Sequence, residues 1–271
     1  MSARPQAEIS SLRNPLVVSM RDLHRAADRR ARNLTLIEGP HLVTEAIDRA
    51  VVRQVLWTPG RDPSCDAVAV RAREMGLDVR SCTAAVLQRV ADTITPHGIV
   101  ASIERPHPAP IDSARLSLVV DGVQDPGNVG ALVRTAAAAG ATEVVCTIGT
   151  ADPYGPKAMR AGAGAQFRLP IRIGMEPNEI APWLENAPLY VAMADGMTAY
   201  SEVDWTAACA LAIGAESQGV SPVLRECART SVRIPLHAQV ESLNAAAAAA
   251  VVLFEAARQR AAPRLEGPSR G

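Results

Sequence analysis

The sequence predicts an α/β protein with a parallel-sheet domain in its second half and a smaller α/β domain before it. Two apolar strands, 116–120 and 142–148, flank a helical stretch at 131–140, and such a βαβ unit implies parallel strands. Short strands and helices also alternate between residues 34 and 104. Between the halves, residues 105–110 contain three prolines, a composition that disfavours helix and suits a linker.

The first half of the chain is expected to form a compact domain over residues 1–105. Residues 13–32 are polar, rich in arginine and compatible with one helix. The pattern of apolar residues then predicts strands at 34–39, 52–58, 77–80 and 98–104, with helices between them at 41–50, 65–75 and 83–91.

The second half is expected to form a domain over residues 116–260, after a linker at 106–115. Beyond its opening βαβ unit, further strands are predicted at 189–194, 209–214 and 231–235, and a long alanine-rich helix at 244–260. The polar tail, 261–271, contains glycine and proline and is expected to be disordered.

Charge is balanced over the whole chain but not along it. The 28 basic and 28 acidic residues cancel, whereas residues 1–105 hold 15 basic and 12 acidic side chains. Between residues 13 and 32, six arginines face only Asp22 and Asp28. Such a cluster can neutralise several phosphates of a nucleic acid, and it is equally compatible with a solvated helix face. Three of these arginines are taken as candidate RNA-binding residues, namely Arg29, Arg30 and Arg32.

Cysteine usage and hydropathy argue against several classes of protein. Five cysteines are scattered along the chain without any CxxC pair, which disfavours a disulfide framework or a zinc site. The N-terminus lacks the apolar stretch of a signal peptide, and no uncharged apolar run reaches the ~18 residues of a membrane span. We therefore expect a cytoplasmic protein with reduced thiols, no metal and no membrane contact.

Three segments of the second half place polar residues or glycines where a predicted strand ends. In open α/β sheets, ligands bind outside the carboxyl ends of the strands. In the first segment, Gly127 and Gly130 permit close backbone approach, and Asn128 lies at an expected helix start. Arg134 follows within an otherwise apolar helix, where it is either a functional cation or a structural ion-pair partner.

The second segment, 212–222, is a strand that runs into a turn carrying Glu216. Gly214 and Gly219 indicate backbone folded tightly round a flat ligand, although an ordinary surface turn fits the pattern equally well. The segment has neither a GxxxxGK[ST] phosphate loop nor an ordered GxGxxG motif. A nicotinamide-dependent α/β enzyme is therefore disfavoured.

The third segment, 233–256, is expected to contain a capped helix. Ser242 is predicted to be the N-cap of a helix that begins near Asn244. An alanine run at the start of this helix lets another backbone approach closely. Tight packing explains the pattern without any catalytic role.

Taken together, the three segments closely resemble the motifs of the SpoU/TrmH family, within the SPOUT class of methyltransferases. The stretches that carry the resemblance are DGVQDPGNVGALVRTAAAAGA (121–141), IGAESQGVSP (213–222) and VRIPLHAQVESLNAAAAAAVVLFEA (232–256). Residues 152–171 resemble the family's segment between the first two motifs. The first half is similar to the substrate-binding domain often found ahead of this catalytic domain, through SLRNPLV (11–17), LIEGPHLVTEAI (36–47) and TPHGIVA (95–101).

The resemblance implies a fold and partners that composition and spacing do not. The second domain is expected to carry a deep trefoil knot formed around residues 210–250, and the first to have a small ribosomal-protein-like RNA-binding fold. A homodimer is implied, with its site near the interface. The cofactor implied is S-adenosyl-L-methionine, bound in a bent pose with its adenine held largely by backbone. The residues implied to bind it are Met193, Ala194, Gly214, Glu216, Gly219, Ile234, Leu236, Leu243 and Asn244.

The resemblance also assigns catalytic roles. Arg134 is implied to contact the substrate ribose or phosphate and is the proposed proton acceptor. Because arginine is normally always protonated, an equally defensible role is electrostatic, lowering the pKa of the substrate hydroxyl. Four further residues are implied to orient the sugar, the arginine and the cofactor carboxylate, namely Asn128, Glu216, Ser242 and Asn244. The second motif departs from the family's usual Gly-Asn-Glu, since Ala215 stands where the asparagine is expected.

The activity implied is methylation of a ribose 2′-hydroxyl in RNA, with 23S ribosomal RNA preferred over tRNA because of the two-domain layout. A ribosomal methylase that confers resistance to a thiopeptide antibiotic is an alternative role, and a tRNA 2′-O-methyltransferase is another. A noncatalytic RNA-binding or ribosome-assembly protein on the same fold is a third alternative, disfavoured by the complete set of motifs.

Overall fold

The computed structural model describes residues 7–106, 115–237 and 241–261, and the chain divides into two compact units. The first unit comprises Met1–His107 and Asp152–Arg168, and the second comprises Pro108–Ala151 and Leu169–Gly271. The chain therefore leaves the second unit once and returns to it. The predicted linker, 106–115, and tail, 261–271, lie almost entirely outside the described residues, so the predicted domain limits stay predictions.

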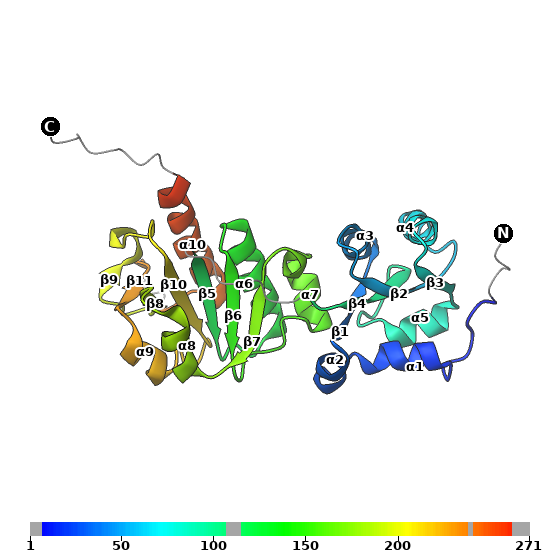
Figure 1. Ribbon diagram of the computed structural model, residues 1–271, viewed down its shortest axis with the longest axis horizontal. Coiled ribbons are helices and arrows are strands. Elements are labelled where there is room, and N and C mark those ends of the chain that lie inside the picture. Colours follow the sequence, from blue (N-terminus) through cyan, green and yellow to red (C-terminus); the bar gives the residue numbers. More distant parts are fainter. Residues whose placement is uncertain (1–6, 107–114, 238–240, 262–271) are drawn as a thin grey trace. The chain divides into compact units, whose positions relative to one another are not determined.

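The first unit is a four-stranded sheet covered by helices on both faces (Figure 1). The strand order is β1-β4-β2-β3, with β4 antiparallel to β1 and β2, and β2 parallel to β3. Its elements are α1 (Pro15–Asp22), α2 (Ala26–Arg32), β1 (Leu34–Glu38), α3 (Pro40–Asp48), β2 (Val52–Trp57), α4 (Pro63–Glu74), β3 (Asp78–Ser81), α5 (Ala84–Val90), β4 (Ile99–Glu104), α7 (Pro156–Gly162) and the short 3-10 helix η1 (Ala165–Phe167).

Apolar side chains of α1 and α5 cover one face of this sheet. Met20 and Leu87 pack with Leu36, Leu56 and Val100, and all five are almost completely buried. α3 and α4 lie on the other face (Figure 1). The predicted strands and the helices between them are confirmed here, because their apolar residues recur with the period of each element.

The prediction of one helix over residues 13–32 is wrong, since the chain breaks between α1 and α2. Arg29 occupies the break: its Nη1 donates to the carbonyl oxygens of Leu23 and His24, both at 2.8 Å. The same guanidinium pairs with Asp152, at 2.9 Å from Nε and 2.8 Å from Nη2. Arg29 is buried, with 6% of its side chain exposed. It therefore satisfies carbonyls that the helix break leaves open, rather than facing solvent.

Three other arginines of the cluster are engaged by neighbouring residues, including Arg21, which pairs with Asp22. Arg25 pairs with Asp22 and Asp28, and Arg32 donates to both oxygens of Ser19. Arg30 is exposed, and within the described residues no hydrogen bond or ion pair engages its guanidinium. Of the three arginines predicted to bind RNA, only Arg30 thus presents a guanidinium that is free for a phosphate.

The second unit is built on a parallel seven-stranded sheet in the order β7-β6-β5-β10-β8-β11-β9. Every pairing is parallel, which confirms the predicted parallel-sheet domain. Its elements are β5 (Leu116–Asp121), α6 (Pro126–Ala138), β6 (Glu143–Thr147), β7 (Ile171–Met175), α8 (Pro177–Leu184), β8 (Leu189–Ala192), β9 (Thr198–Ala199), the 3-10 helix η2 (Tyr200–Glu202), β10 (Cys209–Gly214), α9 (Pro222–Cys227), β11 (Thr230–Arg233) and α10 (Ala245–Ala261).

Helices cover both faces of this sheet, which explains the continuous apolar runs of its central strands. α6 and α10 pack side by side on one face (Figure 1). On the other face, Ile180 and Leu184 of α8 and Leu224 of α9 pack with Val119 and Val145. β6 and β8 lie on opposite sides of the β5–β10 pair, so the connections reverse direction there and their carboxyl ends form the expected place for a ligand. The knot expected around 210–250 stays a prediction, since residues 238–240 lie outside the described part of the chain.

The hydropathy of the helices and the state of the cysteines were both subjects of predictions from composition. No described helix is both long and apolar enough to cross a lipid bilayer. All five cysteines are free, and only Cys227 is exposed. Burial raises the pKa of the Cys65 and Cys82 thiols to about 11, so both are protonated at neutral pH.

Substitution of Arg29 tests whether its ion pair with Asp152 at the helix break stabilises the fold. We expect Arg29→Ala to lower the free energy of unfolding by about 3 kcal/mol, because it removes a buried guanidinium and leaves the Asp152 carboxylate, which is only 11% exposed, without this partner. Arg30→Ala, at an exposed position on the same helix, should change it by less than about 0.5 kcal/mol. Urea unfolding of the two variants checks this, and equal small effects would show that the ion pair is not structural.

Candidate active site

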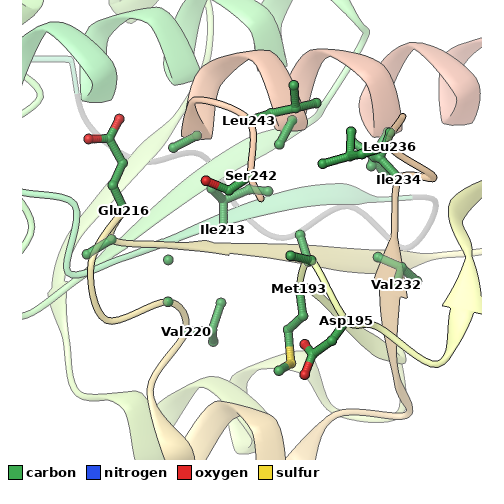
Figure 2. Close-up of a pocket in the computed structure, with 18 of the residues that line it drawn as sticks. Met193, Asp195, Ile213, Glu216, Val220, Val232, Ile234, Leu236, Ser242 and Leu243 are labelled. Carbon is green, nitrogen blue, oxygen red and sulfur yellow. The ribbon is translucent and has the colours of Figure 1, made fainter. Parts of the chain in front are cut away.

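A cavity of about 270 Å³ opens in the second unit beyond the carboxyl ends of β8 and β10. It is lined by the turns after those strands, by the end of β11 with the segment that follows it, and by the start of α10 (Figure 2). Eight of the nine residues predicted to bind the cofactor line it: Met193, Ala194, Gly214, Glu216, Gly219, Ile234, Leu236 and Leu243. Their binding roles stay predictions, but the structure brings them to one place.

The walls of the cavity are mainly apolar. Ile213 and Val220 come from the second motif, Val232 and Ile234 from β11 and its end, and Leu243 from the third motif (Figure 2). Such walls suit a flat, uncharged ring, while backbone groups at the strand ends remain as hydrogen-bonding partners.

The turn after β10 depends on its two glycines. A Cβ atom at Gly214 would collide with the backbone of Gly219. Gly219 has a φ of +67° and its N–H donates to the carbonyl of Ala215 at 2.7 Å. Arg225 holds the far side of the turn by donating to the carbonyls of Val220 and Gln218. The turn is thus closed through backbone, and the missing asparagine at 215 is not needed to shape it.

Two carboxylates lie at opposite ends of the cavity (Figure 2). Glu216 belongs to the second motif, whereas Asp195 follows β8 and was not predicted from the sequence. Both are exposed. An apolar cavity with a carboxylate at either end suits a ligand that combines a flat ring with positive charge, as S-adenosylmethionine does in its adenine, its sulfonium and its ammonium group.

A triangle of hydrogen bonds joins the three motifs beside the cavity. Glu216 Oε1 accepts from Asn128 Nδ2 and from Asn244 Nδ2, both at 2.9 Å. Asn244 Nδ2 also lies 3.1 Å from Asn128 Oδ1. Three of the residues assigned to catalysis therefore meet. We refer to this set as the Asn-Glu-Asn triangle.

A buried aspartate, which sequence reasoning did not single out, fixes the segment that follows the turn carrying Glu216. Asp121 ends β5 and is 5% exposed. Its Oδ1 accepts from the Thr147 hydroxyl and its Oδ2 from the Ser221 N–H, both at 2.7 Å. It thereby ties the ends of β5 and β6 to the segment after Gly219. A carboxylate at a strand end was the available signal.

The helix starts in this site are set by two side chains. Asp125 caps α6, accepting from the Asn128 N–H at 2.9 Å, so α6 begins earlier than predicted. Asn244 caps α10, accepting from the N–H groups of Ala246 at 3.0 Å and Ala247 at 3.4 Å. The prediction that Ser242 is the cap is therefore wrong. Ser242 lines the cavity instead.

Arg134 lies on α6 with its side chain in solvent. Within the described residues, no ion pair or hydrogen bond engages its guanidinium. A structural arginine in an apolar helix would be expected to have an acidic partner nearby, so its exposure favours the functional interpretation. Its catalytic role stays a prediction.

The described residues offer no cluster of three or more His, Cys, Asp or Glu side chains that could hold a metal ion. The prediction that no metal takes part is not tested by this and remains a prediction.

Comparison with known families gives two matches that together span most of the chain. The profile of the SpoU rRNA Methylase family matches residues 115–254. The profile of the MRM3-like substrate binding domain matches residues 14–101.

Individual relatives match over nearly their full length. The 23S rRNA (guanosine(2553)-2′-O)-methyltransferase RlmP of Bacillus subtilis is 32% identical over 91% of this chain and 98% of its own. The crystal structure of an RNA 2′-O ribose methyltransferase has a TM-score of 0.80 and 30% identity, covering 94% of this chain and 99% of that one. An AdoMet-bound rRNA methyltransferase from Sinorhizobium meliloti has a TM-score of 0.82 and 27% identity, covering 93% and 97%.

The double role of Asn244 can be separated by substitution. Asn244→Ala removes both the helix cap and the amide donor, and we expect it to lower the free energy of unfolding by about 1 kcal/mol. Asn244→Ser keeps a capping oxygen but loses the amide, so its stability should stay within a few tenths of a kcal/mol of the original. Chemical denaturation measures both. Equal losses in the two variants would contradict the capping role.

Proposed function

The chain belongs to the SpoU rRNA Methylase family, and we propose that it transfers a methyl group from S-adenosylmethionine to a ribose 2′-hydroxyl of 23S ribosomal RNA. The observation that carries the proposal is the Asn-Glu-Asn triangle at the mouth of the apolar cavity, with the free guanidinium of Arg134 on the same helix as Asn128. The relative RlmP supports the choice of RNA, since its name assigns it a guanosine 2′-O-methylation in 23S rRNA.

Side chains and backbone groups of the cavity would hold the cofactor by different contacts. The apolar side chains of Ile234, Leu236 and Leu243 would cover the adenine, and the backbone of the turn from Gly214 to Gly219 would supply hydrogen bonds. When bound, S-adenosylmethionine supplies a methyl group on a positively charged sulfur, a centre that an oxygen nucleophile can attack. Glu216 is placed to stabilise positive charge at one end of the cavity.

Arg134 acts by charge in this proposal. A ribose hydroxyl is a weak nucleophile at neutral pH, and its proton must pass to solvent water as the oxygen takes up the methyl group. The guanidinium stays protonated, so it lowers the pKa of a nearby hydroxyl and binds the adjacent phosphate, instead of accepting the proton. Asn128 and Asn244 keep Glu216 in place, which orients the sugar and the cofactor.

The first unit selects the RNA, in keeping with its match to a substrate-binding domain. The bonds of Arg29 to Asp152 and of Arg32 to Ser19 support a role for both arginines in the fold of this unit. We therefore assign phosphate contact to Arg30. We also propose a cytoplasmic location, because ribosomal RNA is found there. No observation favours the tRNA or antibiotic-resistance alternatives.

We propose further that the protein is a homodimer formed through the second unit. Phe254 of α10 is 51% exposed, although it belongs to the third motif and does not line the cavity. Large apolar side chains exposed this way are better explained by a second copy of the chain than by solvent.

The proposed function is tested by Arg134→Ala. Methyl transfer to 23S ribosomal RNA should fall at least about 100-fold, because an electrostatic contribution to the reaction is lost, while cofactor affinity and the melting temperature remain unchanged. Arg134→Lys should rescue poorly, since lysine lacks the planar fork. Single-turnover transfer of a labelled methyl group measures this.

The Asn128→Ala variant, alone and combined with Arg134→Ala, tests whether the two residues act together. It should also impair transfer, and the double variant should be hardly slower than Arg134→Ala, because residues that act as a unit are not additive. Near-normal transfer by a folded Arg134→Ala protein would contradict the assignment and favour a noncatalytic RNA-binding protein.

The homodimer is tested by light scattering at micromolar concentration. We expect twice the mass of the 28.6 kDa chain. Phe254→Ser should shift the equilibrium toward monomer because it removes apolar area from the proposed contact. A monomeric wild-type protein would rule out the dimer without affecting the proposed chemistry.

A further inference from the structure

We propose that Ile94, at the tip of the loop formed by residues 92–97, is an apolar contact for unpaired bases of the RNA substrate. The proposal rests on the proposed function and names a recognition residue in the first unit. Ile94 is 92% exposed, more than any other large apolar side chain among the described residues. The Ile94 side chain is exposed to water, although burying it in the core of the domain would stabilise the fold.

The loop that carries Ile94 is held by a buried carboxylate. Glu38, at the end of β1, is 7% exposed. Its Oε2 accepts from the N–H groups of Asp92 at 3.2 Å and Thr93 at 3.3 Å, and its Oε1 accepts from the Thr93 hydroxyl. Because both oxygens of this buried carboxylate accept hydrogen bonds from the start of the loop, they fix the path of the backbone there.

Side chains from three other segments also contact the loop. Gln88 of α5 donates to the carbonyl of Ile94 at 3.0 Å, and Arg61 donates to the carbonyl of Pro96 at 3.0 Å. Arg160 of α7 pairs with Asp92 at 2.6 Å. The backbone is thus anchored before, at and after position 94, while the Ile94 side chain itself is left in solvent. This arrangement is that of a preorganised contact, which loses little entropy on binding.

The chemistry of the loop fits RNA better than another protein. Residues 14–101, which include the loop, match a substrate-binding domain, and the substrate proposed for this chain is RNA. Thr95 and His97 are exposed beside Ile94 and can hydrogen-bond to base edges. The carboxylates of Glu38 and Asp92 at the start of the loop are engaged by donors, which reduces their repulsion of phosphates. Sequence-specific proteins read RNA mostly at unpaired bases, whose exposed faces an apolar side chain such as that of Ile94 can contact.

The test measures affinity for a full-length 23S ribosomal RNA transcript, by filter binding at several salt concentrations without cofactor. Ile94→Ser should raise the Kd about tenfold, or 1.4 kcal/mol, at every salt concentration. It should leave the slope of log Kd against log salt unchanged, because no phosphate contact is lost. Arg30→Ala should instead reduce that slope by about one. In methyl transfer, Ile94→Ser should raise KM with kcat unchanged.

Two variants keep the result interpretable. Val70→Ser removes a 51%-exposed apolar side chain from α4 of the same unit and should leave the Kd within twofold. Ile94→Trp keeps a large apolar surface and should bind within threefold of wild type, which a loss of folding in Ile94→Ser could not produce. The melting temperatures of all three variants should match wild type.

The proposal is overturned if Ile94→Ser binds within twofold of wild type, or if Val70→Ser weakens binding as much. It is also overturned if Ile94→Ser leaves the Kd unchanged but lowers the mass in solution, since Ile94 would then face a second copy of the chain. If the wild-type protein transfers no methyl group to the transcript, the proposed function fails, while the comparison of Kd values still decides the role of Ile94.

Discussion

The hydrogen bonds that converge on Glu216 Oε1 set the geometry of the whole site. They bring together Asn128 and Asn244, which lie 88 and 28 residues away from Glu216 in the chain. The parallel sheet makes this possible, because the carboxyl ends of β5 and β10 lie side by side, with Gly214 in register with Asp121. Glu216 and Asn244 are exposed and Asn128 is partly buried, so each bond alone contributes little to stability. Their value lies in fixing three separate motifs relative to the cavity.

The cavity in turn depends on how closely the backbone can approach itself. The turn from Gly214 to Gly219 leaves no space for a side chain at its first residue, and Asp121 clamps the chain just beyond it through Ser221. This explains why Ala215 is compatible with the fold: the turn is held by backbone and by Arg225, and not by the side chain at 215. In the first unit, buried polar side chains likewise fix the backbone around exposed ones. Glu38 holds the loop that exposes Ile94, and Arg29 holds the helix break beside the exposed Arg30.

The sequence predicted most strands of both sheets and the residues that meet in the site, because apolar periodicity and three dense motifs are local signals. It did not predict β7 and α8, since β7 is a largely exposed edge strand that contains Gly174, and α8 contains Pro182. Nor did it foresee that Asp152 pairs with Arg29 over 123 residues, which turned a candidate phosphate ligand into a structural residue. Ser242 was assigned the cap because serine is a common N-cap, but Asn244 lies closer to the first helical N–H groups. Ile94 gave no signal, since an isolated isoleucine in a polar loop has no period.

The central claim is that the site modifies the ribose and not the base, and the position of the transferred methyl group tests it most directly. An unmodified 23S ribosomal RNA transcript would be incubated with the protein and methyl-labelled S-adenosylmethionine, then hydrolysed completely in alkali. Alkaline cleavage requires a free 2′-hydroxyl, so a 2′-O-methyl group protects the adjacent bond. The account predicts that the label appears in an alkali-resistant dinucleotide, and that Arg134→Ala removes it. Label in a mononucleotide carrying a methylated base would contradict the account.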